Sequence, residues 1–116
     1  MFDLSGLKGV YVCQEAMDMR RGMYRLAAYV EQEMSESPFA PYLYVFFSRN
    51  HKQLKILYWE NTGFWLWQKR LEKGRFHLPA TEENTVLRLQ ELRWIIEGIT
   101  PIKPQAQTGV KARKIC

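Results

Sequence analysis

The chain has few of the residues from which metal centres and redox sites are built. Its 116 residues include two cysteines and two histidines. Cys13 and Cys116 form neither a metal-ligand motif nor a disulfide framework, so a reduced, cytoplasmic setting fits best. His51 and His77 have no cysteine or acidic residue at ligand spacing. We therefore expect no metal ion and no cofactor.

Other absences exclude further classes of protein. The N-terminus has no secretory signal, and no apolar run is long enough to cross a bilayer, so no membrane contact is expected. There is no glycine-rich phosphate loop and no serine in a nucleophile elbow. Nothing marks the N-terminal carboxylates Asp3, Glu15 and Asp18 as convergent on a divalent ion. We expect a protein that is not an enzyme and has no small-molecule substrate.

What the chain does have is a globular composition, with 47% hydrophobic and 25% charged residues. Folding at this length buries roughly two-thirds of the surface of the unfolded chain, which is enough for one core. Residues 1–100 are expected to form a single domain. Residues 101–116 lack periodicity and are expected to form a basic, flexible tail.

The order of the expected elements gives the fold class. Strands are predicted at 9–14, 42–48, 53–59 and 64–71, and the short links between the last three predict an antiparallel meander. An apolar stripe predicts a helix from an N-cap at Asp18 to a point before Pro38, and a second stripe predicts a short helix closed by Gly98 and Pro101. The two stripes consist of Met19, Met23, Leu26, Val30 and Met34, and of Leu89, Leu92, Ile96 and Ile99. We therefore predict an α+β domain, a small antiparallel meander packed with one longer N-terminal helix and one short C-terminal helix.

The meander also assigns the aromatic residues to faces. With a turn at residues 61–62, Ile56, Tyr58, Trp65 and Trp67 share one face, and Leu57, Trp59, Phe64 and Leu66 share the other. Both faces are apolar, so the tryptophans are expected mainly in the core. The alternative is that Trp65 or Trp67 stacks on nucleic-acid bases.

The positive charge is concentrated in the middle of the sequence. Residues 49–75 hold seven basic and two acidic residues, so this window carries the whole net charge of +5. In the meander these basic residues converge at one end of the sheet, with Glu60 at the other. Such a patch indicates an anionic partner, and a surface that only keeps the chain soluble is the alternative. The basic residues are Arg49, Lys52, Lys55, Lys69, Arg70, Lys73 and Arg75.

The segment DMRRG, residues 18–22, is unusual for the start of a helix. In the predicted helix Arg20 and Arg21 oppose the helix dipole, and Gly22 costs about 1 kcal/mol relative to alanine. A bound anion would offset the first penalty, and close approach of another backbone would explain the glycine. The alternative is that Asp18 simply neutralises the arginines.

DMRRG and the later stretch KILYWENTGFWLWQKRLEKGRF together resemble the small accessory protein, often labelled TnpB, of the insertion-sequence family sixty-six. The resemblance runs from about residue 8 to residue 100. Glu60 stands where the family commonly has Asp, and Arg21 where it often has Lys, and both changes keep the charge. The matching positions are Asp18, Met19, Arg20, Arg21, Gly22, Lys55, Ile56, Leu57, Trp59, Gly63, Lys69, Arg70, Leu71, Glu72, Gly74, Arg75, Phe76, Pro79, Leu92, Glu97, Gly98 and Ile99.

The resemblance implies an accessory protein of DNA transposition that works beside a separate transposase and lacks the phosphoryl-transfer site. The expected partners are the DNA of insertion-sequence ends, the transposase, or both. The alternative is a pure protein–protein interaction module of the transposition complex with no direct DNA contact. The residues expected to contact phosphates or acidic side chains are Arg20, Arg21, Lys55, Lys69, Arg70, Lys73 and Arg75.

Overall fold

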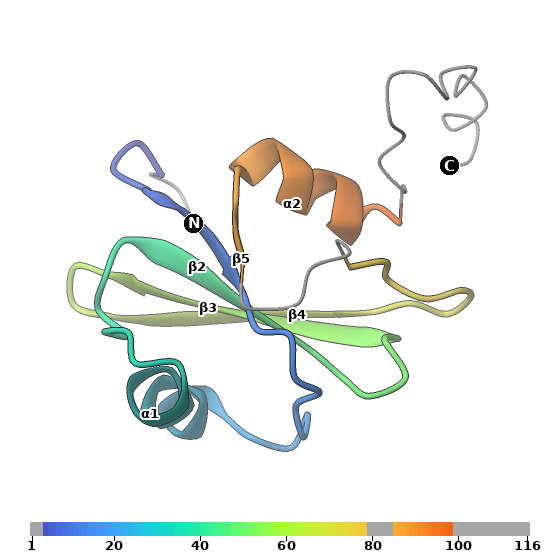
Figure 1. Cartoon of the computed structure of the whole chain (residues 1–116), viewed down its shortest axis with the longest axis horizontal. Helices are drawn as coiled ribbons and strands as arrows, with labels where there is room; N and C mark the ends of the chain where they lie inside the picture. Colours follow the sequence, from blue (N-terminus) through green and yellow to red (C-terminus); the bar gives the residue numbers. More distant parts are fainter. Residues whose placement is uncertain (1–3, 79–84, 99–116) are drawn as a thin grey trace.

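A five-stranded sheet with one helix on each face forms the part of the chain that the computed structural model describes, residues 4–78 and 85–98 (Figure 1). The strand order is β4-β3-β2-β1-β5. The combination of sheet and helices was predicted, but the sheet extends beyond the meander and the N-terminal helix is shorter than expected. The predicted tail, residues 101–116, lies outside the described residues.

The central meander confirms the sequence-based prediction. β2 (Tyr42–Phe47), β3 (Gln53–Glu60) and β4 (Gly63–Arg70) pair in order and antiparallel. A two-residue link joins β3 to β4, with Asn61 at a positive φ of 54°. This link fixes the register, in which Ile56 faces Trp67 and Leu57 faces Leu66, so the predicted division of the two faces is correct.

The first strand corrects the prediction of a purely antiparallel sheet. β1 (Gly9–Val12) pairs with β2 in parallel, because α1 (Met23–Glu33) lies between them and carries the chain back to the same end of the sheet. On its other side β1 pairs antiparallel with β5 (Thr85–Leu87), a three-residue strand too short to leave a sequence signal. α2 (Leu89–Ile96) follows and ends where Gly98 takes a φ of 80°, as expected.

The predicted start of the N-terminal helix was wrong. α1 begins at Met23 with Gly22 as its N-cap, so Asp18 is not the cap and the arginine pair precedes the helix. The Asp18 carboxylate instead accepts a bond from the backbone N–H of Arg20 (2.9 Å), while the N–H of Arg21 donates to the Asp18 carbonyl (3.1 Å). This local turn competes successfully with the helix.

This finding removes both of the sequence-based arguments about DMRRG. Arg20 and Arg21 do not lie in the first helical turn, so they do not oppose the dipole from within the helix. A Cβ added at Gly22 would meet no atom within 4 Å, so no backbone approaches it closely. Glycine here stands at an N-cap, a position where it is tolerated.

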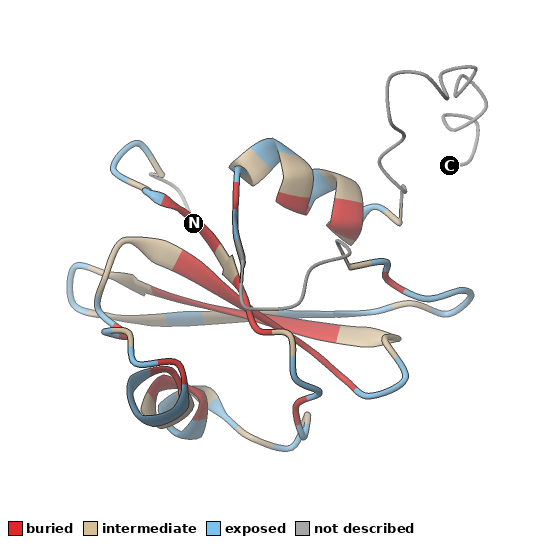
Figure 2. Ribbon diagram, in the orientation of Figure 1, coloured by how far each residue is buried: buried red, intermediate tan, exposed pale blue. Residues whose placement is uncertain are grey.

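Two hydrophobic layers hold the helices on the sheet (Figure 2). The predicted stripe is confirmed as core filling, since Leu26, Val30 and Met34 are buried beneath α1 and Met19 and Met23 pack against them. On the opposite face α2 packs over β1. The buried residues of α2 are Leu92 and Ile95. In the same cluster are Val10, Phe47 and Ile56 of the sheet and Phe76 of the segment after β4.

The tryptophans are less buried than expected. Trp59, Trp67 and Trp94 are half-buried, and Trp65 is 36% exposed. For Trp65 and Trp67 the reason is the position of β4 at the edge of the sheet, whereas α2 packs over β1. The largest fully buried aromatic side chains are instead Tyr44, Phe46, Phe47 and Phe76.

Candidate functional site

Basic residues from separate segments of the chain meet at one end of the sheet. The strand directions bring the C-terminal ends of β1, β2 and β4 together with the start of β3. The backbone N–H of Met17 donates to the Phe47 carbonyl (2.9 Å), and the N–H of Phe76 donates to the His51 carbonyl (2.7 Å). These bonds tie the segments after β1 and β4 to the β2–β3 turn. We call this region the basic end; its basic residues are Arg20, Arg21, Arg49, Lys52, Lys55, Lys69, Arg70, Lys73 and Arg75.

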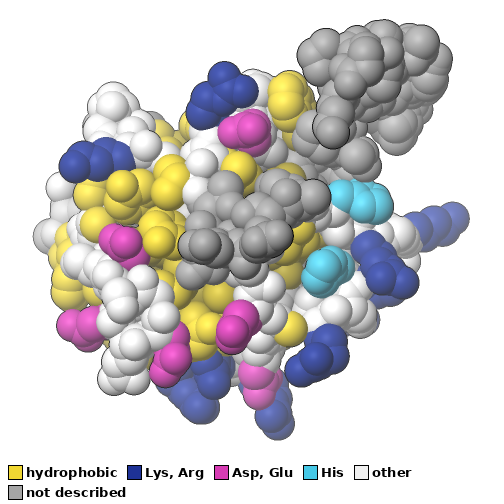
Figure 3. Space-filling model, viewed as in Figure 1, with side chains coloured by type: hydrophobic (Ala, Val, Ile, Leu, Met, Phe, Trp, Pro, Cys, Tyr) yellow, Lys and Arg dark blue, Asp and Glu magenta, His cyan; other side chains and the backbone are white. Residues whose placement is uncertain are grey.

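The surface reflects this convergence. Figure 3 shows Lys and Arg side chains gathered around the right-hand side, next to the two histidines. In Figure 1 the β2–β3 turn and the segment after β4 lie on that side, and the β3–β4 turn lies on the other. DMRRG and the 49–75 window, which are separate in the sequence, therefore share one end of the sheet.

Lys55 has a different place from the one predicted. Its side chain is on the α1 face and is only 8% exposed. The Nζ atom donates to the carbonyl oxygens of Met19 (2.7 Å) and Arg21 (2.8 Å). A buried ammonium needs such acceptors, because an unpaired buried charge is strongly unfavourable. Lys55 therefore fixes the backbone of residues 19–21, which we call the arginine segment. Lys55 itself does not belong to the exposed basic surface.

Lys69 lies on the opposite face of the sheet from Lys55, because neighbouring register positions alternate. Its Nζ donates to the carbonyl oxygen of Ile96 (2.9 Å), at the end of α2. Cations are favoured there by the helix dipole and by the unpaired carbonyls of the last turn. Lys55 and Lys69 thus lie at the same end of the sheet, as predicted, and on opposite faces of it.

Arg20 points into solvent and is paired with Asp18. The shortest contact, from Nη2 to Oδ2, is 2.8 Å, and the Arg20 side chain is 91% exposed. Hydrogen bonds from the Arg20 side chain and backbone hold the pKa of the Asp18 carboxyl well below its ordinary value of 3.8. The alternative that Asp18 neutralises the arginines is therefore correct for Arg20, with which it forms the ion pair.

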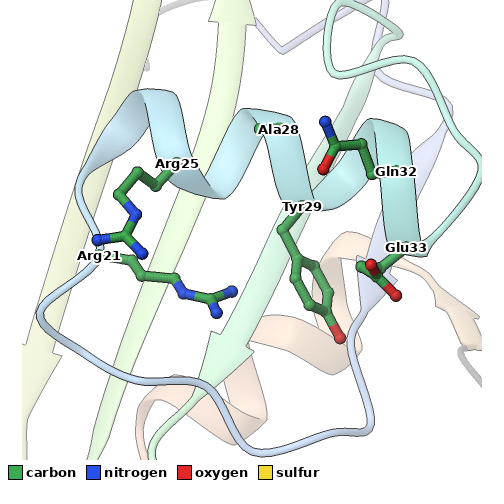
Figure 4. A pocket seen from close by; sticks show the side chains of 6 residues that line it. All are labelled: Arg21, Arg25, Ala28, Tyr29, Gln32 and Glu33. Carbon is green, nitrogen blue, oxygen red and sulfur yellow. The ribbon is translucent and has the colours of Figure 1, made fainter.

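Arg21 lies over an aromatic ring. Its Cζ is 5.6 Å from the ring centroid of Tyr29, and Nη1 is 3.4 Å from the Met17 sulfur. Figure 4 shows Arg21 and Arg25 at one end of a hollow of about 330 Å³, with Gln32 and Glu33 further along α1. Tyr29 thus acts as a platform that holds one guanidinium in place.

A second hollow connects this platform to the β2–β3 turn. It has a volume of about 440 Å³, and both Arg21 and Arg49 line it. Its acidic lining residues are Glu15 and Asp18. Arg21 therefore lies between two hollows and links the helix side of the basic end to the turn.

Sequence reasoning did not select Arg25 and Arg49 as contact residues. Arg25 follows Arg21 by four residues, a spacing that brings side chains together on a helix and offered a usable signal. Arg49 was counted among the basic residues of the 49–75 window but was not chosen as a contact residue. Of the selected residues, Arg70, Lys73 and Arg75 are exposed, and none of them forms a salt bridge within residues 4–78 and 85–98.

The cysteine in the described part of the chain lies inside the fold. Cys13 is buried, and burial raises the pKa of its thiol, which keeps it in the unreactive protonated form at neutral pH. Within the two described ranges no group of three or more His, Cys, Asp or Glu side chains could hold a metal ion. In the same ranges neither helix is long and apolar enough to span a membrane.

Comparison with known proteins yields one family and two relatives. The family described as IS66 Orf2 like protein matches residues 8–106. The uncharacterized protein y4hO of Sinorhizobium fredii is 31% identical over 97 residues, which cover 83% of this chain and 84% of that protein. The uncharacterized protein y4jC of the same organism is 28% identical over 91 residues, 78% of each chain. No solved structure matches at a significant level.

Proposed function

This chain belongs to the IS66 Orf2-like family of transposition-associated accessory proteins, and on that basis we propose that its basic end binds the DNA of insertion-sequence ends. The observation that carries the proposal is the convergence of basic segments at one end of the sheet. A surface with an excess of positive charge attracts the phosphate backbone without reading its sequence. The proposal includes the element's transposase as the second partner and a cytoplasmic site of action.

The residues proposed to contact phosphate are basic residues that form no salt bridge within the described ranges. Arg70, Lys73 and Arg75 are exposed at the end of β4 and in the segment after it. Arg21 and Arg49 extend the surface toward α1 through the hollow that they share. Lys55 and Lys69 support this surface, Lys55 from inside the fold and Lys69 from an exposed position, because their ammonium groups bind backbone carbonyls.

A salt titration of DNA binding tests the proposal. The variant Arg70→Gln with Arg75→Gln is expected to weaken binding to all sequences and to flatten the slope of log affinity against log salt by about two units, since each lost phosphate contact removes about 0.9. Lys8→Gln is the control, because Lys8 is exposed beside the start of β1, away from the basic end. It should leave the slope nearly unchanged.

One outcome would favour the alternative, an interaction module without DNA contact. If the double variant keeps its salt slope and loses binding to the transposase in nuclease-treated samples, the basic end is a protein interface. The proposal assigns no strand-cleaving step to this chain. Cleavage of end DNA by the purified protein with Mg²⁺ would contradict that assignment.

A further inference from the structure

A hollow of about 410 Å³ lies between α1 and the β3–β4 turn, away from the basic end. Two alanines of α1 form one side, and aromatic rings form much of the rest. We call it the aromatic hollow; it is lined by Tyr24, Ala27, Ala28, Glu31, Pro38, Phe39, Trp59, Thr62, Gly63 and Phe64. Its volume is within the range of pockets that bind ligands.

Two aromatic side chains of the hollow are largely exposed to solvent. Phe39 is 57% exposed, and Tyr24 is 76% exposed. Both are held in place by contacts with other rings, since Phe39 stacks on Phe64 with centroids 5.6 Å apart and meets Trp59 edge-on at 4.9 Å. Tyr24 meets Phe64 edge-on at 6.3 Å. Exposed apolar surface of this kind is typical of interaction sites.

The backbone presents Phe39 in a fixed position. The Ser37 hydroxyl accepts a hydrogen bond from the Phe39 N–H (3.1 Å), and Pro38 is buried beneath the segment. The Ser37 carbonyl in turn accepts a hydrogen bond from the Tyr44 hydroxyl (2.7 Å), which ties the segment to β2. An anchor held in its bound geometry loses less conformational entropy when a partner binds.

One charged group identifies the kind of partner. Glu31 is the only charged residue that lines the aromatic hollow, it is exposed, and it forms no salt bridge within the described ranges. A carboxylate here repels phosphate and favours a cation. A second copy of this chain is disfavoured, because each copy carries a net charge of +5.

We propose that the aromatic hollow docks a segment of another protein, which inserts an aromatic or aliphatic side chain between Phe39 and Tyr24 and places a Lys or Arg beside Glu31. This inference is independent of DNA binding at the basic end. It gives the molecule two surfaces of different chemistry, one for an anion and one for an apolar, positively charged segment.

Selection from a display library of random heptapeptides tests the proposal on the full chain. The wild-type protein should enrich peptides with an aromatic or aliphatic residue close to a Lys or Arg. Phe39→Ser should weaken the binding of a selected peptide at least about tenfold, as expected for an anchor in a hot spot. Val86→Ser is the matched control, because Val86 is 51% exposed on β5, outside the hollow, and its loss should leave affinity unchanged.

Glu31→Lys gives a signature that a merely structural role would not produce. A library selected on this variant should shift from basic to acidic residues beside the apolar anchor, while its melting temperature stays at the wild-type value. The proposal is overturned if no motif is enriched, or if both variants select the wild-type motif. It is equally overturned if Phe39→Ser abolishes self-association or oligonucleotide binding instead, since the hollow then belongs to a second copy or to nucleic acid.

Discussion

The β3–β4 hairpin separates two regions whose side chains are held by different means. At the basic end Lys55 and Lys69 bind backbone carbonyls and Arg20 binds a carboxylate. At the aromatic hollow the side chains of Phe39 and Phe64 stack on each other, and no charged group contributes to this contact. The rise of β3 places the two ends of the hairpin about 23 Å apart.

The difference teaches which charges are available for binding. At the basic end the chain uses some of its cations to fix its own backbone, and these hold the others at the surface. At the aromatic hollow the single carboxylate forms no salt bridge within the described residues, and the proposed docking gives it a cation from the partner segment. Variants that disturb one region and spare the other test this separation.

The largest effect is expected from Lys55→Met. The substitution leaves the carbonyls of Met19 and Arg21 without their donor, so we expect the free energy of unfolding to fall by about 1–3 kcal/mol. DNA affinity should fall about tenfold, although Lys55 is buried, because the arginine segment loses its fixed geometry. Urea denaturation and a binding titration measure the two quantities.

Lys8→Met is the control for Lys55→Met, because it removes the same charge from an exposed position. It should change neither quantity appreciably. Peptide binding at the aromatic hollow should be the same in all three proteins. A loss of peptide binding in Lys55→Met would show that the two regions are coupled and would break the comparison.

A smaller effect is expected when the arginine pair is replaced one residue at a time. Arg20→Ala should lower the melting temperature at neutral pH only slightly, because its ion pair with Asp18 is solvated, and Arg21→Ala should lower it slightly more, because Arg21 lies over Tyr29. Arg21→Ala should reduce the salt slope of DNA binding by about one unit, and Arg20→Ala should change it little, because Arg20 is already paired with Asp18. A rise in melting temperature for Arg21→Ala would show that its contact with Tyr29 is not stabilising.

The smallest effect concerns the pH dependence of the 18–21 turn. The pKa of Asp18 is depressed in the folded protein, so its pairing with Arg20 contributes stability above the ordinary pKa of 3.8 and loses it as pH falls through the folded pKa. Carboxyl chemical shifts in an NMR titration should place Asp18 well below 3.8. Arg20→Gln should move it back toward that value, and no change would refute the assigned cause.

Local patterns were enough to predict the sheet faces and the meander. Alternation and a two-residue link decide that Ile56 and Trp67 share a face, and no distant residue is needed for that conclusion. The same holds for the apolar stripe of Leu26, Val30 and Met34, which the structure buries beneath α1.

Contacts between residues far apart in the chain could not be predicted from local sequence patterns. The acceptors of Lys55 are 34 and 36 residues away, so nothing near Lys55 indicates that it is buried. The late start of α1 depends on the same bonds and on the turn at Asp18. The helical spacing of Met19 and Met23 predicted an earlier start, so the turn could not be recognised from the sequence. The extent of tryptophan exposure depends on where α2 packs, which no local pattern gives.

The position of β1 sets an order in which the protein is completed. β1 comes first in the described chain, yet it pairs with β2 on one side and with β5, near the end of the described chain, on the other. Contacts close in sequence form faster, so the β2–β3–β4 meander is expected to form before β1 is enclosed. The arginine segment follows β1 and is fixed by Lys55 of β3, so it takes shape only when these parts have joined. We therefore expect truncated chains that lack β1 or β5 to bind DNA more weakly than the folded protein, because Arg70, Lys73 and Arg75 remain while the arginine segment is no longer fixed.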